Sequence, residues 1–218
     1  RSPLELVQST MRELRCVACH DRDSHSSPRR LIIADESDRG VLPEVLPDLT
    51  WAGEKLHSDW TRQLLTGRLK HPSRPWLKGR MPAFGAWANR LVSGLAAEHG
   101  VSETSRPGPD PDGALATLGG KLALKQNGFN CLQCHGVGKT PAIAPFDNRG
   151  VNFARVRTRL RYNFYLDWMF DPLRLDPHSK MPRFSPDRKT TVLRDVLDGD
   201  ARQQFDALWH YLQATRDE

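Results

Sequence analysis

The sequence has few cysteines and no long apolar run. All four cysteines of the 218 residues fall in two short motifs, so none is left for a disulfide or a separate catalytic thiol. No apolar stretch approaches the roughly 20 residues that a membrane-spanning helix needs. The segment that begins at Arg1 shows no signal peptide, and we therefore expect a mature form or an excised piece of a longer protein.

A signature of nucleic-acid binding is also missing. The formal net charge is +6, yet the interleaving of aromatic and basic residues that is typical of nucleic-acid binders does not stand out. We therefore expect no nucleic-acid partner. A length of 218 residues allows one large or two small domains. Domains of about 100 residues are marginal for burying a core unaided, and a bound apolar group would relieve this problem.

The cysteines stand in Cys-x-x-Cys-His, at residues 16–20 and again at residues 131–135. This pattern is the attachment signature of a c-type haem. Two residues between the thiols place both sulfurs along one side of a helical turn, where each can form a thioether with a porphyrin vinyl group. The His can then reach the iron from below. A lone motif could also be half of a zinc site or a redox dithiol, but its duplication argues against both.

We therefore predict two covalently attached haems c, each with an iron ion. The attachment and first axial positions are predicted at Cys16, Cys19 and His20, and at Cys131, Cys134 and His135. A Met-Pro-x-Phe element follows each motif, with a basic residue before the Met, so Met81 and Met181 are the candidate sixth ligands. An arbitrary Met is more often core filler. The less favoured rivals are His25, His57, His71 and His178.

The local pattern predicts helices around each motif. Apolar residues recur at helical spacing before both motifs, and again near the ends of the two halves. Leu56, Trp60 and Leu64 fall on one face of a further helix. Residues 21–45 are polar and irregular, which predicts a long loop whose role the sequence does not assign. His57 lies one step off the helix face, and we expect it at the surface.

The second nitrogen of each candidate His needs a hydrogen-bond acceptor. A backbone carbonyl near a proline can accept the Nδ1–H and orient the ring. For His20 we favour Pro47 over Pro43. For His135 the choice lies between Pro145 and Pro141.

The two halves align as an internal repeat. Leu56 and Leu160 match with their flanks in register. We predict a first domain at 1–102, a linker rich in Ser, Pro, Asp and Gly at 103–113, and a second domain at 114–218. Gly119 and Gly120 would allow a close crossing by the final helix. A run of arginines in the second half is expected to be mainly a solvated face, or else to hold a haem propionate or dock an acidic partner: Arg149, Arg155, Arg157, Arg159 and Arg161.

With the haem motif, a Pro-containing loop, an aromatic helix, a Met-Pro loop and a closing helix present twice, the chain resembles tandem class I c-type cytochromes. The segment from Gly53 to Pro82 is similar to cytochrome domains appended to large bacterial multidomain redox proteins. The resemblance implies an all-α fold of two tandem class I cytochrome c domains, each a few helices around one covalently bound haem. It also implies two ligand pairs, His20 with Met81 and His135 with Met181. The long loop at 21–45 departs from the family pattern.

The resemblance and the ligand types favour electron transfer over enzyme chemistry. An imidazole and a thioether fill both axial positions and favour Fe(II). We expect a redox partner protein or a fused dehydrogenase domain, and a periplasmic or otherwise extracytoplasmic location, because haem attachment is normally completed there. The alternatives are a dihaem peroxidase-like enzyme and a haem-based sensor with a displaceable Met. The sequence leaves the oligomeric state open.

Overall fold

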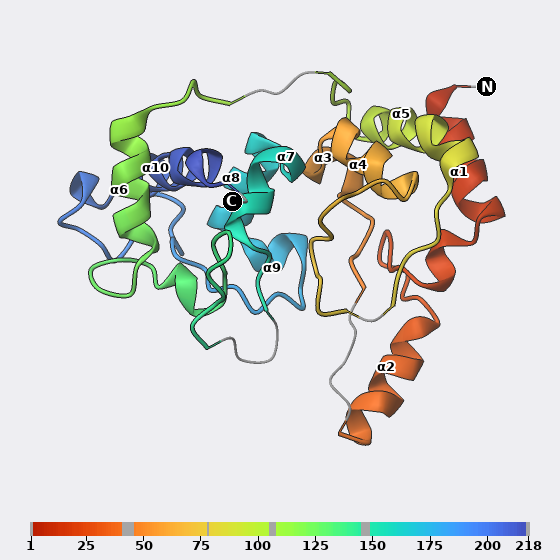
Figure 1. Ribbon diagram of the computed structural model, residues 1–218, viewed down its shortest axis with the longest axis horizontal. Helices are drawn as coiled ribbons and strands as arrows, with labels where there is room; N and C mark the ends of the chain where they lie inside the picture. The colour runs from red at the N-terminus through yellow and green to blue at the C-terminus, as the bar shows by residue number, and fades with distance from the viewer. Residues whose placement is uncertain (1, 41–45, 78, 105–107, 145–148, 217–218) are drawn as a thin grey trace. The chain divides into compact units, whose positions relative to one another are not determined.

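The structure is a computed structural model that describes residues 2–40, 46–77, 79–104, 108–144 and 149–216 (Figure 1). It is 50% helical, and within those ranges it has isolated bridges but no strand. The expected all-α class is thus confirmed. The chain divides into two compact units, which we name unit 1 (Arg1–Ser105) and unit 2 (Arg106–Glu218). The boundary falls inside the predicted linker.

In unit 1 the first helix packs against the last. Helix α1 (Pro3–Glu13) starts with a capping box, in which Ser2 Oγ accepts from the Glu5 N–H at 3.2 Å and the Glu5 carboxylate accepts from the Ser2 N–H at 2.8 Å. It packs on α5 (Ala88–Glu98). A Cβ on Gly94 would lie 2.2 Å from the Val7 Cβ, so the two helices approach closely because residue 94 has no side chain.

In the part of the chain between α1 and α5, the sequence predicts one helix through Leu56, but the structure has two helices there. Helix α3 (Ala52–Lys55) ends at Leu56, which is extended at φ −107° and ψ 139°, and α4 (Ser58–Leu65) begins after it. The spacing of Leu56, Trp60 and Leu64 was therefore misread as one helix face. Periodicity alone does not detect the two extended residues, Leu56 and His57, that separate the two helices.

The predicted loop at 21–45 contains a helix, α2 (Arg29–Asp38). Figure 1 shows α2 apart from the other helices of its unit, and α2 buries no residue. Leu31 is 78% exposed. Local ion pairs, such as Arg39 with Asp35 four residues earlier at 3.0 Å, support the helix in place of core packing. Residues 41–45, which include Pro43, lie outside the described ranges.

Unit 2 repeats the crossing of first and last helices. Helix α6 (Gly113–Ala123) packs on α10 (Ala201–Ala214), and a Cβ on Gly119 would lie 2.0 Å from the Ala207 carbonyl oxygen. The expected close crossing at Gly119 is confirmed. Just before α6, the Asp112 N–H donates to His210 Nδ1 at 3.1 Å. The end of the predicted linker therefore packs with unit 2.

The middle of unit 2 shows the same break as unit 1. Helix α7 (Val156–Arg159) ends at Leu160, which is extended at φ −98° and ψ 140°, and α8 (Tyr162–Phe170) follows. The repeat register that pairs Leu56 with Leu160 is therefore present in the backbone. A short helix, α9 (Pro172–Leu175), then leads toward Met181.

A segment found only in unit 2, residues 185–200, separates the Met181 element from α10. The fully buried Gln204 of α10 holds this segment in place. Its side chain accepts from the Thr191 hydroxyl at 2.6 Å and donates to the carbonyls of Leu193 and Val196 at 2.9 and 2.6 Å.

Candidate functional site

Both Cys-x-x-Cys-His motifs adopt the same backbone. Each enters through a left-handed residue, Arg15 at φ 54° and Asn130 at φ 58°, and continues as a 3-10 turn. The His20 N–H donates to the Cys16 carbonyl at 3.0 Å, and its counterpart from His135 to Cys131 is also 3.0 Å long. Two segments with different side chains thus hold two thiols and an imidazole on one tight turn.

The ring of His20 is held from behind by a carbonyl. Its Nδ1 lies 2.9 Å from the Pro47 carbonyl oxygen, which can only accept, so Nδ1 carries the proton. The prediction of Pro47 is confirmed. With the proton on Nδ1, the lone pair is on Nε2, the tautomer that binds a metal through Nε2.

The ring of His135 is held in the same way by a different residue. Its Nδ1 donates to the Val151 carbonyl at 2.8 Å, so the prediction of Pro141 or Pro145 is wrong; Pro145 itself lies outside the described residues. The loops of the two halves differ in length here, and a sequence alignment could not place the acceptor. Burial lowers the pKa of His135, although its bond to Val151 acts to raise it, and this favours the neutral imidazole.

Two neighbours fix the plane of the His135 ring. Phe153 stacks on it with centroids 4.7 Å apart and planes 24° apart. Gly150 lies against the ring, where a Cβ would come within 2.5 Å of Nδ1 and Cε1. The backbone at Gly150 and the phenyl ring of Phe153 thus form a close-fitting cradle for the imidazole.

The first thiol of each motif does not have the character of a redox nucleophile. Burial raises the pKa of Cys16, and it raises the pKa of Cys131 to about 12. The first Cys of a dithiol oxidoreductase needs a lowered pKa, because the thiolate is the nucleophile. All four cysteines are free of disulfides. The redox-dithiol alternative is therefore disfavoured at both motifs.

A zinc site is also disfavoured. Within the residues that the structure describes, no three or more His, Cys, Asp or Glu side chains form a group that could hold a metal ion. Structural zinc needs four such ligands in a tetrahedron. In each motif the two thiols and the imidazole therefore lack the arrangement of a zinc cage.

The two candidate methionines lie in the same units as their motifs, in different surroundings. Met81 is 39% exposed. Met181 packs partly buried against the core of unit 2, and the Trp168 indole N–H donates to its sulfur at 2.9 Å. Phe84 packs on the core of unit 1, and Phe184 lies 4.8 Å from the Phe129 ring. The Phe of each Met-Pro-x-Phe element therefore packs on the core of its own unit.

The rival histidines are placed as follows. His25, His71 and His178 are exposed. His57 is buried at 6% exposure, so its expected surface position is wrong. It directly precedes α4, at the break that the sequence did not reveal.

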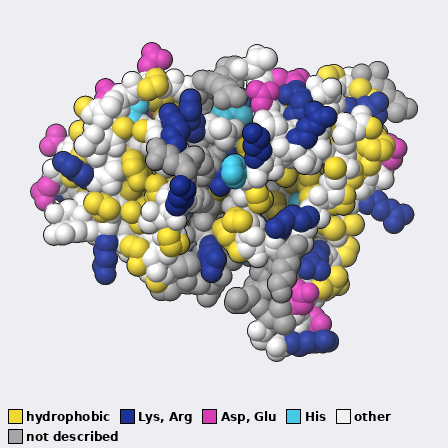
Figure 2. Space-filling view, in the orientation of Figure 1, with side chains coloured by type: hydrophobic (Ala, Val, Ile, Leu, Met, Phe, Trp, Pro, Cys, Tyr) yellow, Lys and Arg dark blue, Asp and Glu magenta, His cyan; other side chains and the backbone are white. Residues whose placement is uncertain are grey.

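The arginine run is only partly a solvated face. Arg149 and Arg157 are exposed, whereas Arg159 and Arg161 are buried at 9% and 4% exposure. Burial lowers the pKa of Arg155. The expectation of a solvated run is thus wrong for the last two arginines, which flank the backbone break at Leu160. In Figure 2, Lys and Arg side chains are spread over the visible face and do not gather in one patch.

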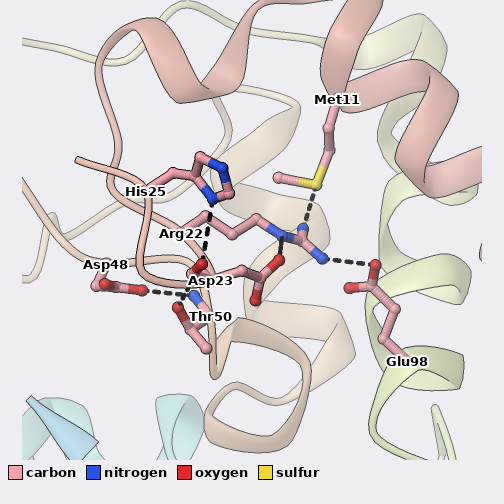
Figure 3. A network of polar contacts seen from close by, with 7 residues as sticks. All are labelled: Met11, Arg22, Asp23, His25, Asp48, Thr50 and Glu98. Atoms are coloured by element: carbon pink, nitrogen blue, oxygen red, sulfur yellow. Dashed lines mark hydrogen bonds and ion pairs between the residues drawn. The ribbon is translucent and has the colours of Figure 1, made fainter. Parts of the chain in front are cut away.

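One polar cluster escaped the sequence analysis. In unit 1, Arg22 lies two residues after His20 and donates to Glu98 of α5 at 2.6 Å, to Asp23 at 2.9 Å and to the sulfur of Met11 in α1 (Figure 3). Burial alone would lower the pKa of Arg22, but the bonds to these carboxylates raise it. The cluster joins the turn after the motif to both crossing helices. No local pattern marks it, because Glu98 lies 76 residues from Arg22 in the sequence and Met11 lies 11 residues from it.

Comparison of the chain with protein-family models, with curated proteins and with solved structures finds no match. No helix within the described ranges is long and apolar enough to cross a membrane.

Proposed function

We propose that this chain is a dihaem c-type cytochrome of the tandem class I kind, which passes electrons between redox partners. The observation that carries the proposal is the duplicated motif geometry. In both units a tight turn presents two thiols, and a backbone carbonyl holds the His ring with Nε2 open for a metal. Burial raises the pKa of the Cys16 and Cys131 thiols, which disfavours a redox dithiol.

The residues present fit a covalently bound haem. Cys16 and Cys19, and likewise Cys131 and Cys134, would form the thioethers. His20 and His135 would bind iron through Nε2, while their Nδ1–H bonds to carbonyls strengthen them as donors. The cradle around the His135 ring orients it before any ligand binds. The bound group would supply one-electron chemistry between Fe(III) and Fe(II).

Met81 and Met181 would complete the coordination. Each is followed by a Pro that restricts the backbone and by a Phe packed on the core. Filling both axial positions leaves no open site for a substrate, so the chain would be a carrier and not a catalyst. It would work with a redox partner protein or a fused dehydrogenase domain, in the periplasm or another extracytoplasmic space.

Haem counting tests this proposal. We expect acid-acetone treatment to leave both haems on the chain, with an intact mass that corresponds to two. The double variant Cys131→Ser with Cys134→Ser should keep only the haem of unit 1, and the matching pair in unit 1 the reverse. Extractable haem, or a single haem in the unaltered chain, would contradict the proposal.

A difference between the two Met loops favours a second candidate function. The Trp168 indole N–H donates to the sulfur of Met181, whereas the repeat register places Leu64, which has no side-chain N–H, at the matching position of unit 1. A Met without that hydrogen bond is easier to displace, as a peroxidase-like enzyme or a haem-based sensor would need. The test is the spectrum of the oxidised, half-reduced and fully reduced protein. A high-spin signal with rapid peroxide consumption in the half-reduced form would favour this candidate, whereas six-coordinate spectra in all three forms favour the carrier.

A further inference from the structure

The sulfur of Met181 is held by a hydrogen bond from α8. The Trp168 indole N–H donates to the sulfur at 2.9 Å. The backbone N–H of Met181 donates to Ser179 Oγ at 3.2 Å. The side chain and the main chain of Met181 are therefore both tied to unit 2.

A buried neighbour orients the indole of Trp168. Phe164, four residues earlier on α8, stacks on it with ring centroids 6.1 Å apart and planes 25° apart. Phe164 is only 2% exposed, so it forms a fixed support for the indole. Residues four apart share one face of a helix.

Unit 1 has no equivalent donor at the matching position. The repeat register that pairs Leu56 with Leu160 places Leu64 of α4 opposite Trp168. A Leu side chain carries no N–H. The two units thus share a candidate Met ligand but differ in what faces it.

We propose that Trp168 is a positioning residue for Met181 and raises the reduction potential of the haem in unit 2. The inference rests on the function proposed above. A thioether sulfur has two lone pairs, so one can bind iron while the other accepts the indole N–H. The hydrogen bond withdraws electron density from the sulfur, which makes it a poorer donor to Fe(III) and so favours Fe(II).

The variant Trp168→Phe, in the intact two-haem chain, removes the donor and keeps an aromatic ring. The variant loses this bond in both oxidation states, and only the difference in its strength between them moves the potential. We therefore expect the Fe(II)/Fe(III) ratio of that haem at a given potential to fall about two- to threefold, less than the roughly tenfold that a whole hydrogen bond would give. The weak red charge-transfer band of Met-ligated Fe(III) should shift with it. The potential of the other haem should stay the same. The variant Met81→Ala changes the reduction potential of the haem in unit 1, and this change shows which of the two measured potentials belongs to which unit.

The control is Trp209→Phe, which changes an indole that packs on Tyr165 in the core of the same unit, with centroids 4.9 Å apart. It should leave the potential of unit 2 unchanged. If both haems are present and Trp168→Phe shifts neither the potential nor the band, the inference is overturned while the proposed function stands. Failure of the haem count would instead overturn the proposed function, before any titration.

If Trp168→Phe does not fold, the unaltered protein supplies the test. In the reduced, diamagnetic state the indole N–H of Trp168 should exchange slowly with solvent and show a nuclear Overhauser effect to the Met181 methyl group. Rapid exchange with no such effect would overturn the inference.

Discussion

Unit 1 and unit 2 have closely similar backbones in the motif turn that carries the His ring. They differ in the side chains that pack around that turn. The motif turns share left-handed entry residues and hydrogen bonds of equal length. A short bridge follows each turn, Arg22 with His25 and Val137 with Thr140. The two turns keep the same backbone although most of their side chains differ. The backbone geometry of the turn is therefore the feature that the two units share.

The residue two positions after each motif His is packed differently in the two units. In unit 1 it is Arg22, paired with Glu98. In unit 2 it is Val137, which packs against the apolar core. A well-packed apolar group can replace a buried ion pair at little or no cost in stability. The residue after the motif turn can thus be packed through an ion pair or through apolar contact with the core.

The acceptor loops differ as well. In unit 2 the residue before the accepting Val151 is Gly150, which touches the His135 ring, whereas in unit 1 the residue before Pro47 is Leu46. The helix crossings use a glycine on opposite partners, Gly94 on the last helix of unit 1 and Gly119 on the first helix of unit 2. Equal architecture therefore rests on different local contacts.

The largest expected effect on haem content comes from a change in the cradle of unit 2. Gly150→Ala places a Cβ within 2.5 Å of the His135 ring, and overpacking of this kind costs about 1–3 kcal/mol. We expect loss of the unit 2 haem with retention of the unit 1 haem, measured by intact mass. Gly113→Ala, where a Cβ meets nothing within 4 Å, is the control. Full haem content in Gly150→Ala would show that the ring can shift.

Met81→Ala and Met181→Ala should each lower the potential of the haem in their own unit and open it to carbon monoxide, because the soft thioether is lost. Redox titration with carbon monoxide difference spectra measures both effects. Met181→Ala also removes the acceptor for Trp168, so we expect the larger shift there. An unchanged potential in either variant would mean that another residue is the ligand.

Arg22→Ala should destabilise unit 1 by about 3 kcal/mol, because it leaves Glu98 buried without its partner. The double variant Arg22→Val with Glu98→Leu replaces the ion pair with apolar side chains, as at Val137 of unit 2, and should recover most of the lost stability. Arg62→Ala, at an exposed pair with Asp59, should cost less than about 1 kcal/mol. Thermal unfolding of the three variants measures this. If the double variant is as unstable as Arg22→Ala, apolar packing cannot replace the ion pair between Arg22 and Glu98.

The smallest expected effect concerns electrostatic steering by the exposed part of the arginine run. Oxidation by the anionic probe ferricyanide should slow as salt rises, and Arg157→Glu should slow it about twofold at low salt. Arg68→Glu makes the same change at an exposed site in unit 1 and shows which unit steers the probe. A rate that is flat across ionic strength would assign these arginines to solubility.

The features that could be predicted are those whose pattern lies within a short stretch of sequence, and the features that were missed depend on distant residues or lack an apolar pattern. The motif spacing predicts a turn, and the turn is present twice. Pro47 was found because a proline marks the acceptor loop. Val151 was missed because its role depends on where a loop of different length returns to the ring. Helix α2 was missed because its sequence buries nothing and its support comes from ion pairs.

By itself the sequence determined the two Cys-x-x-Cys-His motifs, the all-α class, the repeat register and the candidate Met positions, because each follows from residue type and spacing along the chain. Only the tertiary structure decided which carbonyl orients each His, that Arg22 meets Glu98, and that Trp168 donates to Met181. These contacts join residues 13 to 76 positions apart. Their pairing depends on how loops and helices return to one place, which spacing along the chain does not encode.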